Sequence, residues 1–143
     1  MILLDVNIVL AAHREDHPHH RLVYPWLQRV VAEQGSFCVP DEVWAAVVRL
    51  ATNRRVFGDP SSLNEVFAFA DAVRAQPGHA ALRSGPRRFE VFRTLCHDGQ
   101  AAGDLVPDAF LASLAIENGC RLASLDRDFA RFPGLTWVQP GRS

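Results

Sequence analysis

The chain has 143 residues, of which 48% are hydrophobic and 22% are charged, so it can form one domain over residues 1–143 with a substantial core. The formal net charge of −1 excludes a protein that binds nucleic acids through overall positive charge, and leaves only a local basic patch for that purpose.

Strand-like and helical segments alternate through the first half of the chain. Residues 2–6 are apolar apart from Asp5 and predict a strand buried on both faces, and residues 8–13 begin the helix that covers it. Pro18 can open a second helix, which Gly35 ends. The next patterns predict a strand at 37–39, a helix at 41–50 capped by Asp41, a helix at 63–75 and a short edge strand at 79–83.

The second half of the chain repeats the alternation. Asp104 is expected to cap one of its helices and Gly119 to end that helix. Repeated strand-then-helix order predicts an α/β fold of three layers, α/β/α, around a central parallel sheet of about four to five strands. The expected elements are helices at 86–97 and 105–118 and strands at 122–125 and 136–138. The predicted core includes the helix residues Val43, Trp44, Val47, Val48, Leu50, Val66, Phe67, Phe69 and Val73.

Cysteine usage and the N-terminus indicate the compartment. Cys38, Cys96 and Cys120 show no Cys-x-x-Cys spacing, which argues against a disulfide framework and against a zinc site. The N-terminus has no basic segment before a long apolar run, and no later run is long enough to cross a bilayer. We therefore expect a cytoplasmic protein with no membrane partner.

Acidic residues follow the predicted strands or begin the predicted helices. The carboxyl ends of parallel strands meet at one edge of a sheet, where ligands bind in open α/β folds, so we expect these side chains to converge. The residues concerned are Asp5, Glu42, Asp108, Asp126 and Asp128.

Each acid also has a purely structural interpretation. Asp108 can complement a helix dipole, and Asp126 with Asp128 can form a solvated turn. Glu42 can pair with a nearby arginine on a helix face. Asp5 has no ordinary packing role inside a buried strand, and the common placement of all five favours a functional site.

Converging carboxylates have a chemical consequence. Like charges raise one another's pKa, and a hard divalent cation such as Mg²⁺ or Mn²⁺ offsets the repulsion. Such a site activates water toward a phosphodiester. We assign Asp5 and Asp108 as metal ligands, Asp126 as a ligand to the same or a second ion, Glu42 as a water-mediated ligand or general base, and Asp128 as an orienting group.

Four blocks of sequence together resemble the PIN-domain ribonucleases, and among them the VapC toxins of bacterial VapBC toxin–antitoxin pairs. The blocks are 3–7 (LLDVN), 40–44 (PDEVW), 103–112 (GDLVPDAFLA) and 124–129 (SLDRDF). The resemblance implies a PIN-like fold and a Mg²⁺- or Mn²⁺-dependent endoribonuclease. It makes Asp5, Glu42, Asp108 and Asp126 the acidic quartet, with Asp128 a fifth carboxylate and Asn7 and Ser124 hydrogen-bonding to the site.

The resemblance also implies partners. These are an RNA substrate, a VapB-type antitoxin whose C-terminal segment places an arginine against the carboxylates, and a second copy of the chain docked through the helices before the edge strand. One residue departs from the pattern, because Val6 stands where the family commonly has a small hydroxyl residue. A hydrogen bond to the site must then be missing or come from elsewhere.

Basic and imidazole side chains are candidates for substrate contact. We predict that RNA phosphates are held by Arg49, Arg54, Arg55, Arg87 and Arg88, the alternative being solvated helix ends. The bunched histidines, His13, His17, His19 and His20, surround Pro18 without a shared face, so we expect solvated side chains and at most contact of His13 or His17 with substrate.

Two other functions use a similar site. The first is a metal-dependent phosphatase or DNA nuclease; an aspartyl-phosphate enzyme, however, needs Asp-x-Asp at the first strand end and a lysine, and this chain has Asp5-Val6-Asn7 and no lysine. The second is a PIN fold that binds RNA or protein without cleaving RNA. Loss of one or more of the acids would indicate this alternative.

Overall fold

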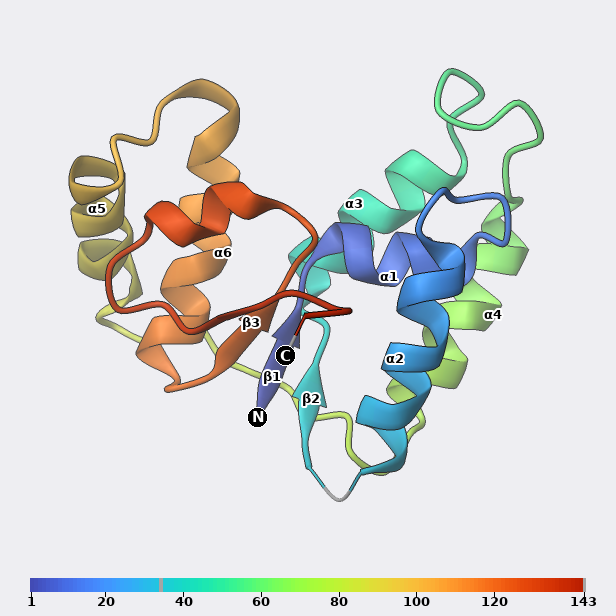
Figure 1. The fold of residues 1–143 in the computed structure, drawn as a ribbon, viewed down its shortest axis with the longest axis horizontal. Helices are drawn as coiled ribbons and strands as arrows, with labels where there is room; N and C mark the ends of the chain where they lie inside the picture. The colour runs from blue at the N-terminus through green and yellow to red at the C-terminus, as the bar shows by residue number, and fades with distance from the viewer. Residues whose placement is uncertain (34, 143) are drawn as a thin grey trace.

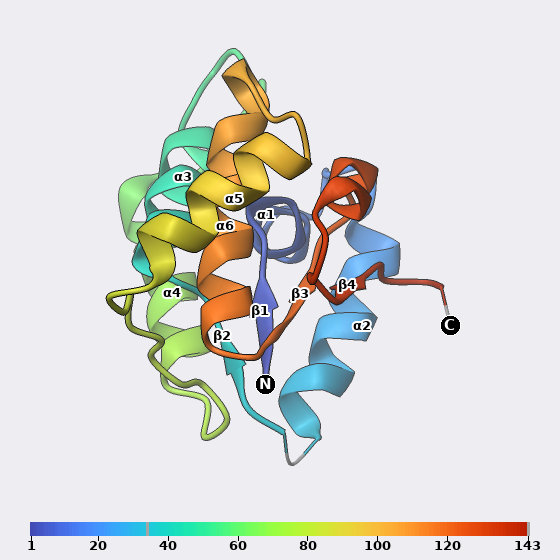
Figure 2. The same cartoon turned by 90° about the vertical axis from the view of Figure 1, so that its left-hand side faces the viewer.

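The computed structural model describes residues 1–33 and 35–142 and contains a four-stranded parallel sheet of order β2-β1-β3-β4. The strands are β1 (Ile2–Leu4), β2 (Phe37–Cys38), β3 (Arg121–Ala123) and β4 (Trp137–Val138). Helices cover both faces, which confirms the predicted three-layer α/β/α architecture. The turned view places α6 with α5 on one side of β1 and α2 on the other (Figure 2).

The helices lie close to their predicted positions. They are α1 (Val6–His13), α2 (His20–Ala32), α3 (Asp41–Ala51), α4 (Leu63–Arg74), α5 (Arg88–Asp98) and α6 (Val106–Glu117). Two short 3-10 segments, η1 (Gly103–Leu105) and η2 (Arg127–Arg131), precede α6 and follow β3. None of the helices in the described part of the chain is both long and apolar enough to traverse a bilayer.

The core explains why the strands are apolar throughout. Leu3, Leu4 and Leu122 are completely buried because helices cover both faces of the sheet. Helix α3 presents Val43 and Val47 to this core. Phe67 on α4 was predicted to be core, but its side chain is 52% exposed, so that prediction is wrong.

Three local predictions also need correction. The described residues 79–83 form no strand, because only His79 bridges β2, at Phe37. Asp41 does not cap α3: Pro40 holds the N-cap position and Asp41 is the first helical residue. Asp104 does not cap α6 either, because it lies within η1 and Leu105 precedes the helix.

The order of the strands fixes where a site can form. The chain passes from β1 to β2 on one side and returns to β3 on the other side of β1, so the connections diverge between β1 and β3. In open α/β sheets, ligands bind at such a switch point, outside the carboxyl ends of the strands. In Figure 1 this edge lies where β1 runs into α1.

Candidate active site

Asp5 lies at this edge because it ends β1 and begins α1. Its Oδ1 accepts a hydrogen bond of 2.7 Å from the Val6 amide, so the carboxylate caps the helix. The residue is only 7% exposed. Burial raises the pKa of Asp5, hydrogen bonds from Ser124 and the Val6 amide oppose the shift, and the charge of Asp126 adds to it.

A hydrogen-bond network joins the ends of β1 and β3. The Ser124 hydroxyl donates to Asp5 Oδ2 at 2.7 Å and accepts from Asn7 Nδ2 and from the Asp126 amide, each at 3.0 Å. The Leu125 amide donates to Asn7 Oδ1 at 3.0 Å. The hydroxyl of Ser124, the residue directly after β3, thus reaches Asp5, although Val6 supplies none.

Asp108 lies in the first turn of α6, where a negative charge complements the helix dipole. The surroundings of Asp108 also raise its pKa to about 7. Burial is the largest cause, followed by the charges of Asp5, Asp126 and Asp128, while Arg131 lowers it. Carboxylates from β1, α6 and the segment after β3 therefore share one electrostatic environment. We call Asp5, Asp108, Asp126 and Asp128 the aspartate cluster.

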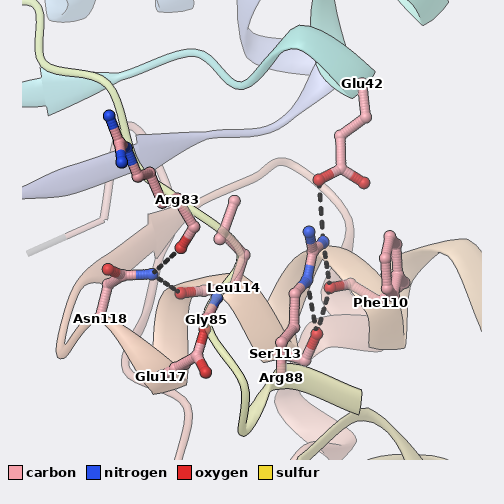
Figure 3. A network of polar contacts seen from close by, with 9 residues as sticks. All are labelled: Glu42, Arg83, Gly85, Arg88, Phe110, Ser113, Leu114, Glu117 and Asn118. Carbon is pink, nitrogen blue, oxygen red and sulfur yellow. Dashed lines mark hydrogen bonds and ion pairs between the residues drawn. The ribbon is translucent and has the colours of Figure 1, made fainter.

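Glu42 belongs to a different environment. It lies in the first turn of α3, shortly after β2, and its Oε1 accepts a hydrogen bond of 2.8 Å from Arg88 Nη2. Figure 3 shows the arginine reaching up from α5 to Glu42 beside α6. Glu42 is not among the acids that raise the pKa of Asp108. The structural interpretation of Glu42, pairing with an arginine, is therefore realised, but with an arginine from another helix.

The donor set of the aspartate cluster fits a hard divalent cation in its chemistry. All four side chains offer carboxylate oxygens, and their mutual repulsion is what a cation relieves. Over residues 1–33 and 35–142, however, no three Asp, Glu, His or Cys side chains stand close enough to hold an ion as they are placed. To hold an ion, the acids would have to move closer together.

The predicted RNA-binding arginines divide by exposure. Arg49, Arg54, Arg55 and Arg87 are exposed at the ends of α3 and α5. Arg88 is only 6% exposed, which corrects its predicted place on an open basic surface. Arg131, whose Nη2 lies 3.5 Å from Asp128 Oδ1 and which lowers the pKa of Asp108, was not identified from the sequence. The available signal was its spacing of three residues from Asp128.

Two of the bunched histidines, His13 and His20, are half-buried and hydrogen-bonded to the protein, so the expectation of solvated side chains is wrong for them. His13 Nε2 lies 2.9 Å from the Ser61 hydroxyl, and His20 Nδ1 lies 2.7 Å from the Ala11 carbonyl. His19 is exposed, as expected of a solvated side chain.

The chain is similar to known proteins in sequence and in fold. The PIN domain family model matches residues 2–135. Ribonuclease VapC31 of Mycobacterium tuberculosis is 52% identical over 140 residues, covering 98% of this chain and 99% of the relative. Ribonuclease VapC25 of the same species is 51% identical with the same coverage. A crystal structure of VapBC2 from Rickettsia felis bound to a promoter DNA fragment matches with a TM-score of 0.71 at 17% identity, over 98% of this chain and 99% of that one.

Proposed function

This chain belongs to the PIN-domain family and, within it, to the VapC ribonucleases, and from that premise we propose an endoribonuclease toxin that uses Mg²⁺ or Mn²⁺. The observation that supports metal use is the pKa of about 7 at Asp108, raised by burial and by three neighbouring aspartates. An acid that retains a proton near neutral pH for this reason readily exchanges it for a divalent cation.

Each residue of the site has a proposed task. Asp5, Asp108 and Asp126 supply the oxygen ligands, and a bound ion supplies an activated water and an offset for the charge that develops on the phosphodiester. Ser124 and Asn7 hold Asp5 against the end of β3 and so fix its orientation. Glu42 orients the attacking water or takes its proton, and Asp128 orients the groups around it.

Cleavage of end-labelled RNA by the purified protein tests this proposal. We expect cleavage with Mg²⁺ or Mn²⁺ and none with excess chelator. Metal should also raise the melting temperature, because a ligand that binds only the folded state at about 100 times its Kd adds about 2.7 kcal/mol. Equal cleavage in chelator would overturn the metal requirement. RNA binding without cleavage in any metal would favour the non-catalytic PIN alternative.

DNA and a phosphomonoester serve as parallel substrates in the same assay. An aspartyl-phosphate phosphatase needs a lysine side chain, and this chain contains no lysine, which argues against the phosphatase alternative. Faster turnover of DNA or of the monoester than of RNA would replace the proposed substrate class.

The proposed protein partners are a VapB-type antitoxin and a second copy of this chain. An antitoxin arginine would find unbalanced negative charge at the aspartate cluster. On α4, Leu63 and Phe67 are 58% and 52% exposed, an apolar surface suited to a homodimer. Sedimentation of the parent and of Phe67→Glu tests the dimer, since a monomeric parent contradicts it. We propose that the protein acts in the cytoplasm, where its RNA substrate is found.

A further inference from the structure

Arg88 is the most completely enclosed charged residue near the proposed site. Its side chain extends from the start of α5 to contacts on α6 and with Glu42 on α3, and the residue is 6% exposed. Nε donates to Ser113 Oγ at 3.1 Å, and Nη2 donates to the Phe110 carbonyl at 2.8 Å. The guanidinium also lies over the Phe110 ring, with Cζ 3.6 Å from the ring centroid. These contacts hold the guanidinium plane in one orientation.

The held guanidinium presents a donor to Glu42. Arg88 Nη2 lies 2.8 Å from Glu42 Oε1, and the Glu42 side chain is 36% exposed, so its other oxygen remains accessible. Elsewhere in the described chain, nothing makes a hydrogen bond or ion pair with the Glu42 carboxylate. A glutamate has several rotatable bonds, and Arg88 restricts them.

The contacts of Arg88 connect two parts of the site. Phe110 and Ser113 lie on α6, the helix that carries Asp108, while Glu42 lies in the first turn of α3. Figure 3 shows this chain of contacts from Glu42 through Arg88 to Phe110 and Ser113. The arginine therefore fixes the acid at the end of β2 relative to the helix that carries an acid of the aspartate cluster.

We propose that Arg88 is a positioning residue for Glu42 rather than a contact for RNA phosphate. This inference rests on the proposed ribonuclease function. An exposed phosphate-binding arginine keeps its donors free for the ligand, whereas Arg88 is buried and uses Nε and Nη2 on groups of the protein. Glu42 acts on the reaction, and Arg88 acts only through Glu42.

A double-mutant cycle tests the proposal. Single-turnover cleavage at saturating RNA is measured for Arg88→Met, Glu42→Gln and the double variant. Arg88→Met should lower the rate about 10- to 100-fold, as loss of outer partners of a metal site does. In the Glu42→Gln background, Arg88→Met should lower the cleavage rate less than about twofold, because Arg88 acts through Glu42 and that residue is already disabled. Arg88→Lys should recover part of the rate, and Arg29→Met, an exposed arginine on α2, is the control.

Two measurements without catalysis complete the test. Urea unfolding in chelator is measured for the parent, Arg88→Met, Glu42→Gln and the double variant. The losses in free energy of unfolding should be non-additive, because Arg88 and Glu42 are paired in the folded state. RNA affinity and its salt dependence should be the same for Arg88→Met as for the parent. Additive unfolding energies would show that the pair is absent in solution and would overturn the proposal.

The other outcomes are equally decisive. An equal loss of rate in both backgrounds would mean that Arg88 only supports the fold. A faster Arg88→Met protein would mean that the ion pair holds Glu42 away from its working position. A salt slope lowered by about one would mean that Arg88 contacts phosphate. Each of these overturns the inference while the parent still cleaves RNA. A parent that leaves RNA intact in Mg²⁺ and Mn²⁺ instead overturns the proposed function, and the inference with it.

Discussion

Carboxylates occupy the same edge of the sheet in two different electrostatic settings. At the ends of β1 and β3 the aspartate cluster has a raised pKa at Asp108 and at Asp5, because burial and mutual repulsion are not fully offset. At the end of β2, Glu42 has its own guanidinium, that of Arg88, at 2.8 Å. Acidic side chains at the same edge therefore carry unbalanced negative charge in one place and are paired with a guanidinium in the other. Position at a strand end alone does not decide which role an acid takes.

Neutralising single acids of the aspartate cluster gives the largest expected effect. Asp5→Asn and Asp108→Asn should each lower RNA cleavage more than about 100-fold, since even outer partners of metal ligands contribute about 10- to 100-fold. The amide keeps the shape of the side chain and removes the charge that holds the metal. Circular dichroism checks the fold, and Asp71→Asn, an exposed acid on α4, is the control. An Asp5→Asn protein that cleaves like the parent would remove the aspartate cluster from the mechanism.

Glu42→Gln extends the same comparison to the balanced acid. It should leave RNA affinity nearly unchanged and lower the single-turnover rate, because Glu42 acts at the transition state and not in binding. Filter binding and single-turnover cleavage on the same protein separate the two quantities. Normal cleavage by Glu42→Gln would leave Glu42 with only its structural partner.

The two settings also differ in how far the sequence predicts them. An acid ending a buried strand is visible as polarity within the run 2–6, and parallel strands bring such ends together, so the convergence of Asp5 and Asp126 follows from pattern and topology. The pair of Glu42 and Arg88 joins residues 46 positions apart, and several arginines were equally available. Only the packing of α5 on α6 selects Arg88, and local pattern holds no information about it.

The misplaced elements have the same kind of cause. Residue 6 was expected in the first strand, but Asp5 accepts a hydrogen bond from the Val6 amide and caps α1, which begins at Val6. The edge strand expected at 79–83 is reduced to one bridge between His79 and Phe37, because β2 itself spans only Phe37–Cys38. Propensity located these segments, while tertiary hydrogen bonds determined where each one ends.

Ser124→Ala tests whether the hydrogen-bond network supports the aspartate cluster. The change removes the donor to Asp5 and the acceptor for Asn7 and the Asp126 amide. Cleavage should fall about 10- to 100-fold, and the free energy of unfolding should fall by about 1–3 kcal/mol because buried polar groups lose their partner. Single-turnover kinetics and urea unfolding measure the two effects, with exposed Ser84→Ala as control. A variant as active and as stable as the parent would assign the orientation of Asp5 to other groups.

The pH dependence of stability in chelator tests the repulsion itself. Asp108 holds its proton up to about pH 7 in the folded protein and loses it near 3.8 in the unfolded chain. The folded state thus binds more protons across this window, so the contribution of Asp108 to stability is present below pH 3.8 and is lost as the pH rises through 7. The metal-free parent should therefore lose melting temperature, relative to Asp108→Asn, between pH 5 and pH 8.

The comparison with Asp108→Asn removes a competing effect. Burial lowers the pKa of His13, of His17 and of His79, and these groups change stability with pH in the opposite direction. Because both proteins contain the same histidines, the difference between their melting temperatures isolates Asp108. Parallel curves from pH 5 to pH 8 would contradict the raised pKa.

The smallest expected effect concerns the exposed arginines and sharpens the contrast with buried Arg88. Arg54 and Arg55 after α3 and Arg87 at the start of α5 are exposed, so a phosphate backbone can reach them. Changing any one of them to Gln should weaken RNA binding a few-fold and lower the salt slope by about one, because each lost phosphate contact releases one counterion fewer. Arg88→Gln should leave the slope unchanged, because Arg88 is buried and its Nε and Nη2 already bind Ser113 and other groups of the protein.

Filter binding over a salt series in chelator measures these slopes without cleavage. Metal binding, followed by the rise in melting temperature, should be the same in all the arginine variants, since none of them lies in the aspartate cluster. If the exposed variants keep the parent slope while Arg88→Gln lowers it, the assignments must be exchanged: RNA would then enter along α5 and α6, and the enclosed arginine would have to open toward solvent to meet it.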